Sequence, residues 1–169
     1  MPHLDAAYRF ARWLSHTPAD ADDVVQDAML RAFRGFDGLR GADAKSWLLA
    51  IVRNCHSTAH RDRQRRAFVP LPEEHDEEDG HAMVASTPDP ESATMNADHA
   101  RTLDRLMAEL PVEHREVLVL REIEDMDYRE IAAVTQVAIG TVMSRLARAR
   151  AALKKRWCQN VEGEAHELR

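Results

Sequence analysis

Six basic side chains near the end of the chain have the types and spacing for nucleic-acid binding. No acidic residue interrupts them, and they are Arg145, Arg148, Arg150, Lys154, Lys155 and Arg156. Lys and Arg neutralise phosphates, and the planar guanidinium group of Arg fits the edge of a guanine base. A solvated helix whose cations complement the helix dipole would have the same composition. Charge alone therefore leaves both interpretations open.

The sequence before and within this basic stretch favours DNA binding, because residues 126–156 have the layout of a helix-turn-helix. Asp127 and Glu130 fit a capping box at the start of a short helix. The run Thr135-Gln136-Val137 then interrupts the apolar pattern. After Gly140, one face of a second helix is apolar (Val142, Leu146, Ala149, Leu153) and another is polar or basic (Thr141, Ser144, Arg145, Arg148). The pattern predicts that this second helix contacts the major groove.

Three further helices are predicted near the N-terminus, over about residues 4–15, 18–34 and 43–66. Thr17 and Pro18 supply a cap and a first-turn proline for the second of these. Its apolar side is expected to hold Val24, Val25, Ala28, Met29, Ala32 and Phe33. The third helix is expected to bury Trp47, Leu48, Ile51, Val52 and Cys55 and to end in a basic tail.

The formal charge of −6 is concentrated in one segment. Residues 70–100 contain nine acidic residues and no Lys or Arg, whereas residues 1–69 have a net charge of +3 and residues 101–169 a net charge of 0. Prolines and the scarcity of large apolar residues predict a flexible linker there. We expect an all-α fold of two small domains: a three-helix domain (residues 1–68), an acidic linker (69–97) and a four-helix domain (98–169).

Other classes of protein have weaker support. No apolar stretch approaches the length of a membrane span, and the N-terminus lacks a signal-peptide pattern, so we expect no membrane insertion and a cytoplasmic protein. Cys55 and Cys158 form no CxxC motif. His56 and His60 have the i, i+4 spacing of zinc ligands, but no HExxH surrounds them, and both are expected to be solvated. We therefore expect no enzyme, metal or cofactor.

The two halves together resemble the extracytoplasmic-function (ECF) sigma factors of bacterial RNA polymerase. In the N-terminal half the resemblance rests on residues 19–33, the stretch Phe36-Asp37-Gly38-Leu39-Arg40-Gly41 and the stretch 46–54 (SWLLAIVRN). In the C-terminal half it rests on residues 110–118 (LPVEHREVL) and the helix-turn-helix. The match covers nearly the whole chain outside the linker.

The resemblance implies a transcription-initiation subunit whose partners are core RNA polymerase, through its two largest subunits, promoter DNA and an anti-sigma factor. It implies polymerase contacts at Asp22, Asp23, Gln26, Asp27 and Arg31. Minus-10 recognition and melting would involve Arg40, Asp43, Trp47, Arg53 and Asn54. Minus-35 recognition would involve Tyr128, Arg129, Thr141, Met143, Ser144, Arg145 and Arg148. Gln136 stands where the family often has glycine, Met143 where many members have Lys or Arg, and the segment before the first helix is short for the family.

Two alternatives remain at the level of sequence. A transcriptional regulator with the same DNA-binding module would carry a sensing or dimerising N-terminal domain, and residues 22–31 and 40–54 argue against one. A zinc enzyme would use the histidine pair. The acidic linker is also expected to weaken DNA binding by the free protein, through competition for basic surfaces.

Overall fold

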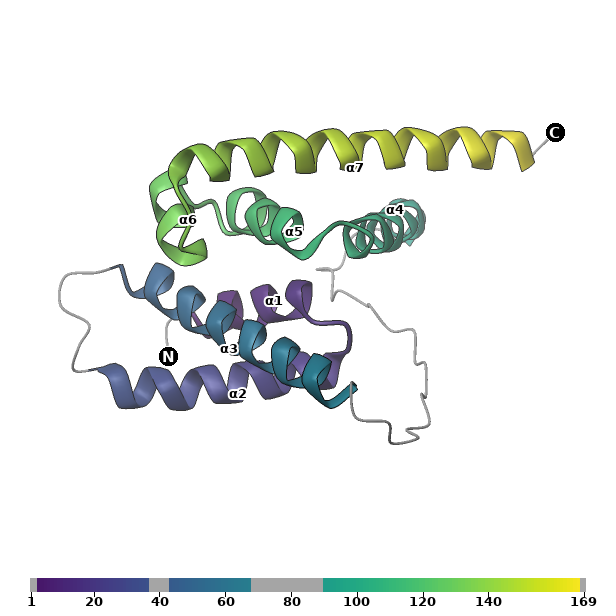
Figure 1. Cartoon of the computed structure of the whole chain (residues 1–169). Helices are drawn as coiled ribbons and strands as arrows, with labels where there is room; N and C mark the ends of the chain where they lie inside the picture. The colour runs from purple at the N-terminus through teal and green to yellow at the C-terminus, as the bar shows by residue number, and fades with distance from the viewer. Residues whose placement is uncertain (1–2, 37–42, 68–89, 168–169) are drawn as a thin grey trace.

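The computed structural model describes residues 3–36, 43–67 and 90–167, and within these ranges it contains helices and no strands. The helices form two groups (Figure 1). We call α1–α3 the N-terminal half, and α4–α7 with the short π-helical turn η2 the C-terminal half. The predicted all-α class, with three helices before the linker and four after it, is confirmed.

Local capping signals determine where the N-terminal helices begin. The helices are α1 (Leu4–Leu14), α2 (Pro18–Gly35) and α3 (Ala44–Ala67). The Thr17 side chain accepts a hydrogen bond from the backbone N–H of Asp20 at 3.1 Å, and Pro18 occupies the first helical position, where a missing N–H costs nothing. The Asp43 carboxylate accepts hydrogen bonds from the backbone N–H and the hydroxyl of Ser46, at 2.7 and 2.8 Å. All three predicted helices are confirmed within about two residues.

The sequence-based prediction for one side chain of α2 is wrong. Phe33 was expected on the apolar side with Val24, Ala28 and Ala32, yet it is 78% exposed. At about 100° per residue, Phe33 lies roughly 140° from the centre of the stripe that those three buried residues form. Helix α2 therefore presents an aromatic ring to solvent near its C-terminal end.

The C-terminal half contains α4 (Pro90–Ala108), α5 (Val112–Leu118), η2 (Val119–Ile123), α6 (Tyr128–Thr135) and α7 (Ile139–Glu167). Helix α4 begins at Pro90, inside the range predicted as linker. A helix can begin there because proline is tolerated at the first helical position. The sequence did not predict this start, because apolar residues are sparse in the segment and show no helical period. The acidic run at residues 73–79 lies outside the described residues.

The helix-turn-helix is formed as the sequence predicts. The Asp127 carboxylate accepts hydrogen bonds from the backbone N–H groups of Arg129 and Glu130, at 2.7 and 2.8 Å. The Glu130 carboxylate accepts one from the backbone N–H of Asp127 at 2.6 Å, which completes the capping box. Helix α6 ends at Thr135 and is followed by the C-cap residue Gln136, whose backbone is left-handed with φ 56° and ψ 39°. Gln136 thus occupies a conformation that favours glycine.

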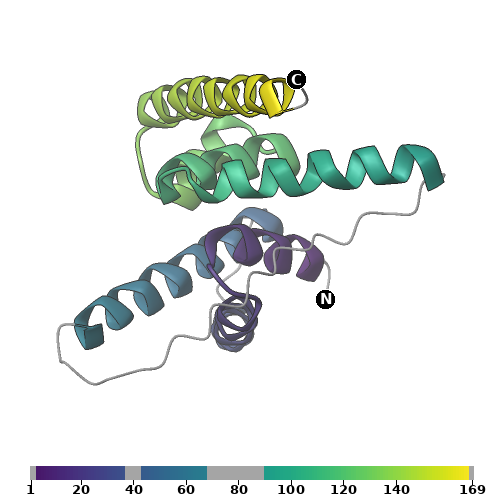
Figure 2. The same cartoon turned by 90° about the vertical axis from the view of Figure 1, so that its right-hand side faces the viewer.

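The two halves pack directly against each other. Helix α3 contacts α6, and α1 contacts α5 and η2. Figures 1 and 2, which differ by a quarter turn, both show the C-terminal half lying along one side of the N-terminal half. Buried apolar residues from both halves form one continuous cluster. We call this arrangement the closed form.

The two cysteines have different surroundings. Cys55 is buried beside Asp27, and burial together with the hydrogen bond to that carboxylate raises the pKa of the thiol to about 11. Cys158 is exposed on α7. Within the described ranges, no helix is both long enough and apolar enough to cross a membrane.

Candidate nucleic-acid interface

The N-terminal part of α7 presents most of the predicted minus-35 residues to solvent. Met143, Ser144 and Arg148 are exposed, whereas Thr141 and Arg145 are half-buried. The Ser144 hydroxyl donates a hydrogen bond to the carbonyl oxygen of Thr141 at 2.9 Å. Ser144, Arg148, Thr141 and Arg145 span an arc of about 100° on the helix, while Met143 lies outside it. The structure thus groups four of the five residues predicted on this helix.

The start of α6 adds Tyr128 and Arg129 to this region. Arg129 is exposed in the first turn, and Tyr128 is half-buried. The Arg121 guanidinium lies over the Tyr128 ring, 5.6 Å from its centroid, and donates a hydrogen bond to the carbonyl oxygen of Met126 at 2.7 Å. The cation–π contact holds the ring in place, because a stacked cation is attracted to the face of the ring.

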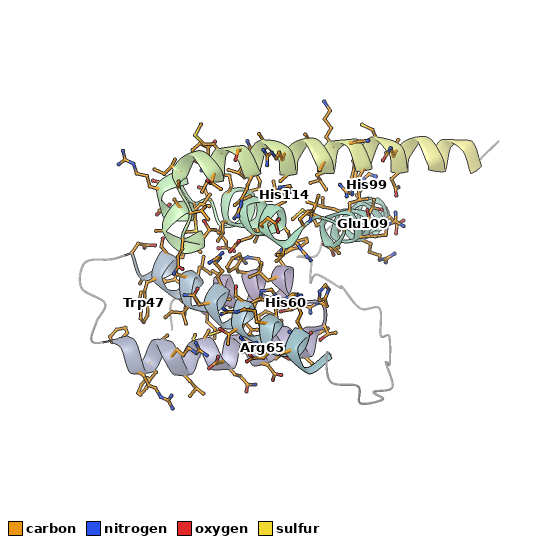
Figure 3. All side chains as sticks on the ribbon, viewed as in Figure 1. Trp47, His60, Arg65, His99, Glu109 and His114 are labelled. Atoms are coloured by element: carbon orange, nitrogen blue, oxygen red, sulfur yellow. The ribbon has the colours of Figure 1, made fainter. Side chains whose placement is uncertain are left out.

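The basic stretch on α7 is only partly available to a ligand. Arg150 pairs with Glu122, its Nε lying 3.0 Å from a carboxylate oxygen, and Arg156 pairs with Glu109 at 3.2 Å. Lys154 and Lys155 are exposed. The uninterrupted positive charge that the sequence indicates is therefore reduced by Glu122 of η2 and by Glu109, which directly follows α4. Figure 3 shows Glu109 at the end of α4, beneath α7.

The predicted minus-10 residues divide between two faces of α3. Asp43 is exposed and caps the helix, Trp47 is half-buried against the end of α2, and Asn54 is exposed. Figure 3 shows Trp47 near the start of α3. These three residues share one face, whereas Arg53 lies about 100° away from Asn54 and is directed toward the C-terminal half. Arg40 lies outside the described residues.

The predicted polymerase-binding residues lie along α2. Asp22, Asp23 and Gln26 are exposed, and Arg31 pairs with Asp27 at 2.8 Å. The hydrogen bond from Arg31 holds the pKa of the Asp27 carboxyl below its usual value. Sequence reasoning missed the aromatic part of this surface: the rings of Phe33 and Phe36 are exposed here, beside the exposed side chain of Leu30. Their positions every three residues were a signal for a shared helical face.

Within the part of the chain that the structure describes, three ion pairs connect the two halves. Glu124, which follows η2, accepts hydrogen bonds from Arg9 at 2.8 Å and pairs with Lys45 at 2.9 Å. Burial raises the pKa of the Glu124 carboxyl, but Arg9 and Lys45 outweigh this effect and hold it below its usual value. Glu116 on α5 pairs with Arg53. Burial raises the pKa of the Glu116 carboxyl, and the charge and hydrogen bond of Arg53 only partly offset this.

His56 does not match its sequence prediction. It was expected to be solvated, yet it is buried, because α3 packs on two sides and His56 lies on the second one. Burial is the main cause that lowers its pKa to about 4, and electrostatic interactions with His60, Arg63 and Arg115 act in the same direction. The rings of His56 and the exposed His60 lie 6.1 Å apart. Among the described residues, no group of three His, Cys, Asp or Glu side chains could hold a metal ion.

Comparison with known proteins identifies the family. Residues 1–66 match sigma-70 region 2, and residues 100–153 match sigma-70 region 4. The chain is 38% identical over 158 residues to the ECF RNA polymerase sigma factor SigM of Mycobacterium tuberculosis, covering 90% of this chain and 72% of that protein. The chain belongs to the ECF sigma factor family.

Two further relatives have similar levels of identity. The chain is 34% identical to the RNA polymerase sigma-H factor of Pseudomonas aeruginosa, covering 83% of this chain and 74% of that protein. It is also 34% identical to the ECF RNA polymerase sigma factor SigE of Mycolicibacterium smegmatis, covering 90% of this chain but only 57% of that protein. This ECF sigma factor therefore spans little more than half the length of SigE and nearly three quarters of the other two.

Two solved structures resemble this ECF sigma factor along both halves. The sigma factor RpoE in complex with the anti-sigma factor NepR, from Bartonella quintana, has a TM-score of 0.67 and 27% identity, and covers 91% of each chain. CnrH in complex with the cytosolic domain of CnrY has a TM-score of 0.58 and 29% identity, covering 90% of this chain and 80% of that one. Helices α1–α3 and helices α4–α7 each contain fewer than half of the residues of the chain. TM-scores above 0.5 therefore require residues from both groups to superpose.

Proposed function

We propose that this ECF sigma factor binds core RNA polymerase, recognises minus-35 and minus-10 promoter elements and initiates transcription of a signal-responsive set of genes in the cytoplasm. The observation that carries the proposal is the capped helix-turn-helix in a chain that also matches sigma-70 region 2. A regulator would need the first of these but not the second. The role is that of a recognition subunit, and catalysis belongs to the polymerase.

The minus-35 element is assigned to the start of α7 together with the start of α6. Exposed Ser144 and Arg148 can donate hydrogen bonds to base edges or phosphates, and the N-terminal turns of a recognition helix are the part that enters the major groove. Arg129 lies in the first turn of α6, where a basic side chain suits a phosphate contact. Arg145 is half-buried and lines a cavity together with residues of both halves.

The minus-10 element is assigned to the face of α3 that carries Trp47 and Asn54. A half-buried indole offers a surface on which an unstacked base can stack, and base–aromatic stacking contributes about 1–3 kcal/mol per base. Asn54 can recognise a base edge by donating and accepting hydrogen bonds. Asp43 supports this face indirectly, because its carboxylate caps the helix. Capture of a flipped base offsets the few kcal/mol that unstacking costs.

Polymerase binding is assigned to α2. Its outer surface combines the acidic and polar residues Asp22, Asp23 and Gln26 with the apolar side chains Leu30 and Phe33. Exposed aromatic residues next to charged ones are typical of the energetic centres of protein interfaces. Control by an anti-sigma factor is part of the proposal, because the two solved relatives are each described in complex with another protein, named as an anti-sigma factor for RpoE.

Transcription by a reconstituted holoenzyme tests the proposal. Core polymerase with the purified chain should start RNA synthesis at a defined set of sites on genomic DNA that core polymerase alone does not use. Sequencing of RNA 5′ ends would identify these sites. Absence of new start sites, despite binding of the chain to duplex DNA, would overturn the sigma function and favour a regulator.

Substitution on α2 tests the polymerase surface separately. Phe33→Ala should weaken binding to core polymerase by about fivefold or more, the scale of an interface residue that contributes about 1 kcal/mol. Val161→Ala is the matched control, because Val161 is an exposed apolar residue on the distant end of α7. Equal affinities of the two variants would remove α2 from the assignment.

A further inference from the structure

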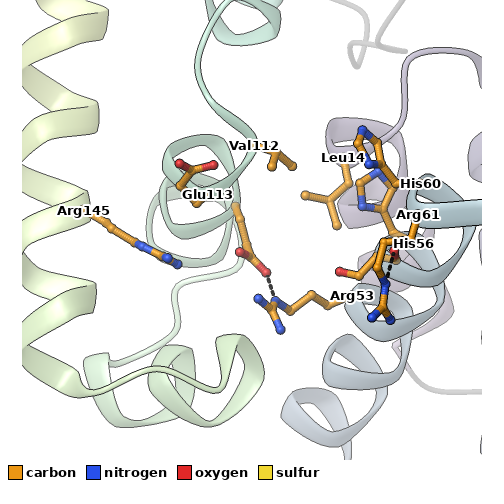
Figure 4. A pocket seen from close by; sticks show the side chains of 10 residues that line it. Leu14, Arg53, His56, His60, Arg61, Val112, Glu113 and Arg145 are labelled. Carbon is orange, nitrogen blue, oxygen red and sulfur yellow. Dashed lines mark hydrogen bonds and ion pairs between the residues drawn. The ribbon is translucent and has the colours of Figure 1, made fainter. Parts of the chain in front are cut away.

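At the surface between the two halves, the ion pairs join cations of the N-terminal half to carboxylates of the C-terminal half. The N-terminal half supplies three cations, which we call the basic face: Arg9, Lys45 and Arg53. The C-terminal half supplies two carboxylates, which we call the acidic pair: Glu116 and Glu124. Every ion pair that connects the halves in the described residues joins these two sets. Figure 4 shows Arg53 at this surface, with its ion pair drawn as a dashed line.

The acidic pair is far more buried than the basic face. The side chains of Glu116 and Glu124 are 6% and 1% exposed, whereas those of Lys45 and Arg53 are 26% and 22% exposed. A buried carboxylate without a cation is strongly unfavourable, and loss of one partner from a buried pair is more costly than loss of an exposed pair. The closed form therefore depends on the basic face.

A neighbouring cavity contains predicted DNA-binding residues from both halves. It has a volume of about 270 Å³ and is lined by Arg53 and His60 of α3, Glu116 of α5 and Arg145 of α7, among others (Figure 4). The Arg145 Nη1 atom is buried and has no hydrogen-bond partner within the described part of the chain. This cavity between the halves thus brings together a predicted minus-10 residue and a predicted minus-35 residue.

The basic face has the chemistry of a phosphate-binding surface. Nitrogen atoms of Arg9 and Lys45 lie 2.8 and 2.9 Å from carboxylate oxygens of Glu124. The same donors can form charge-assisted hydrogen bonds with phosphate oxygens. On α3, Lys45, Arg53, His56 and His60 fall on one side of the helix, over a length of about 22 Å. A row of polar donors on this scale matches an extended anionic strand better than a single small anion.

We propose that the acidic pair competes in cis with single-stranded nucleic acid for the basic face. The inference rests on the proposed function, because it adds the basic face to the strand-binding surface that carries Trp47 and Asn54. In the closed form the carboxylates occupy the positions of strand phosphates. Only open molecules then bind a strand. The apparent affinity of the free chain is therefore the affinity of the open form multiplied by the fraction of molecules that are open.

The test measures binding of single-stranded DNA by the full chain, without polymerase. A fluorescent oligonucleotide of about 20 nucleotides exceeds the usual site size of about 4–16. Fluorescence anisotropy at low salt gives the dissociation constant, and small-angle X-ray scattering gives the radius of gyration. Glu116→Gln/Glu124→Gln removes the acidic pair with little change of shape. Glu109→Gln/Glu122→Gln is the matched control, because it removes the same charge from two pairs formed within the C-terminal half.

The proposal predicts about tenfold tighter binding and a larger radius of gyration for the acidic-pair variant, and less than about threefold tighter binding with an unchanged radius for the control. Equal affinities of the two double variants would overturn it, as would tighter binding without expansion. Absence of strand binding by every variant would also overturn it, whereas the holoenzyme test above would be unaffected. Circular dichroism verifies that the variants keep their helical content.

Two further variants keep the inference testable if Glu116→Gln disturbs α5. Glu124→Gln alone should move affinity and radius in the same directions as the double variant. Lys45→Gln breaks the pair from the other side, so it should expand the molecule without tightening strand binding, because a strand contact is lost as well. Tighter binding by Lys45→Gln would exclude Lys45 from the strand surface and overturn the proposed extent of the basic face.

Discussion

Acidification should destabilise the protein through His56, and the structure gives the size of the effect. The histidine is 7% exposed, and its pKa in the folded protein is about 4, against an ordinary value of 6.5. Below pH 6.5 the unfolded chain binds a proton at this residue while the folded protein does not. Stability therefore falls as the pH falls from about 6.5 to about 4. Linkage gives a loss of about 1.4 kcal/mol at pH 5.5 and about 3 kcal/mol by pH 4.

The matched variants are His56→Gln and His60→Gln. Both histidines lie on the same side of α3, one turn apart, but His60 is exposed. Free energies of unfolding would be measured by urea titration with far-UV circular dichroism, at pH 7 and pH 5.5. The wild type and His60→Gln should lose about 1.2 kcal/mol more than His56→Gln between these conditions, because a small part of the loss has already occurred at pH 7. Glu116, whose raised pKa has the opposite effect, is present in all three proteins and cancels from the comparison.

One result would refute this reasoning. If His56→Gln loses as much stability as the wild type on acidification, then His56 is not the group that titrates. The cations near it are His16, His60, Arg63 and Arg115, which come from the α1–α2 connection, α3 and α5. Equal losses in all three proteins would place the proton uptake at another residue. Burial of His56 would then not cause the predicted loss of stability at low pH.

Three more outcomes follow from the helix-turn-helix. Asp127→Ala should destabilise the C-terminal half by about 1–2 kcal/mol in thermal unfolding, because it removes both hydrogen bonds of the cap. Gln136→Gly should stabilise it by about 1 kcal/mol, since glycine accepts a left-handed backbone, whereas Gln64→Gly within α3 should destabilise by a similar amount. Arg148→Ala should weaken binding to a minus-35 duplex by about 1–3 kcal/mol while polymerase binding is retained. Arg101→Ala, which changes an exposed residue of α4, should leave both unchanged.

Local features of the fold were predictable because their causes are local. The capping box of Asp127 and Glu130 and the helix break at Gln136 depend on residues within one or two turns of each other. The apolar stripe of α7 is likewise visible in its spacing, and Val142, Leu146 and Ala149 are all buried. Such features need no knowledge of the remaining chain.

The second packed side of α3 was not predictable in this way. Leu49 is fully buried and His56 nearly so, although both lie away from the main apolar stripe. That side also carries Lys45 and Arg53, so its pattern is typical of a solvated surface. Its partners Glu116 and Glu124 lie more than 60 residues away in the chain. One sequence contains no signal that joins positions so distant.

The different chemical environments of the two thiols give a practical means to follow unfolding of one half alone. An alkylating reagent at mildly alkaline pH should modify Cys158 at once and serve as an internal count of molecules. Cys55 should react only during excursions in which the packing around it breaks. The ratio of singly to doubly modified protein, read by mass spectrometry over time, would give the opening rate of the N-terminal core without any engineered reporter.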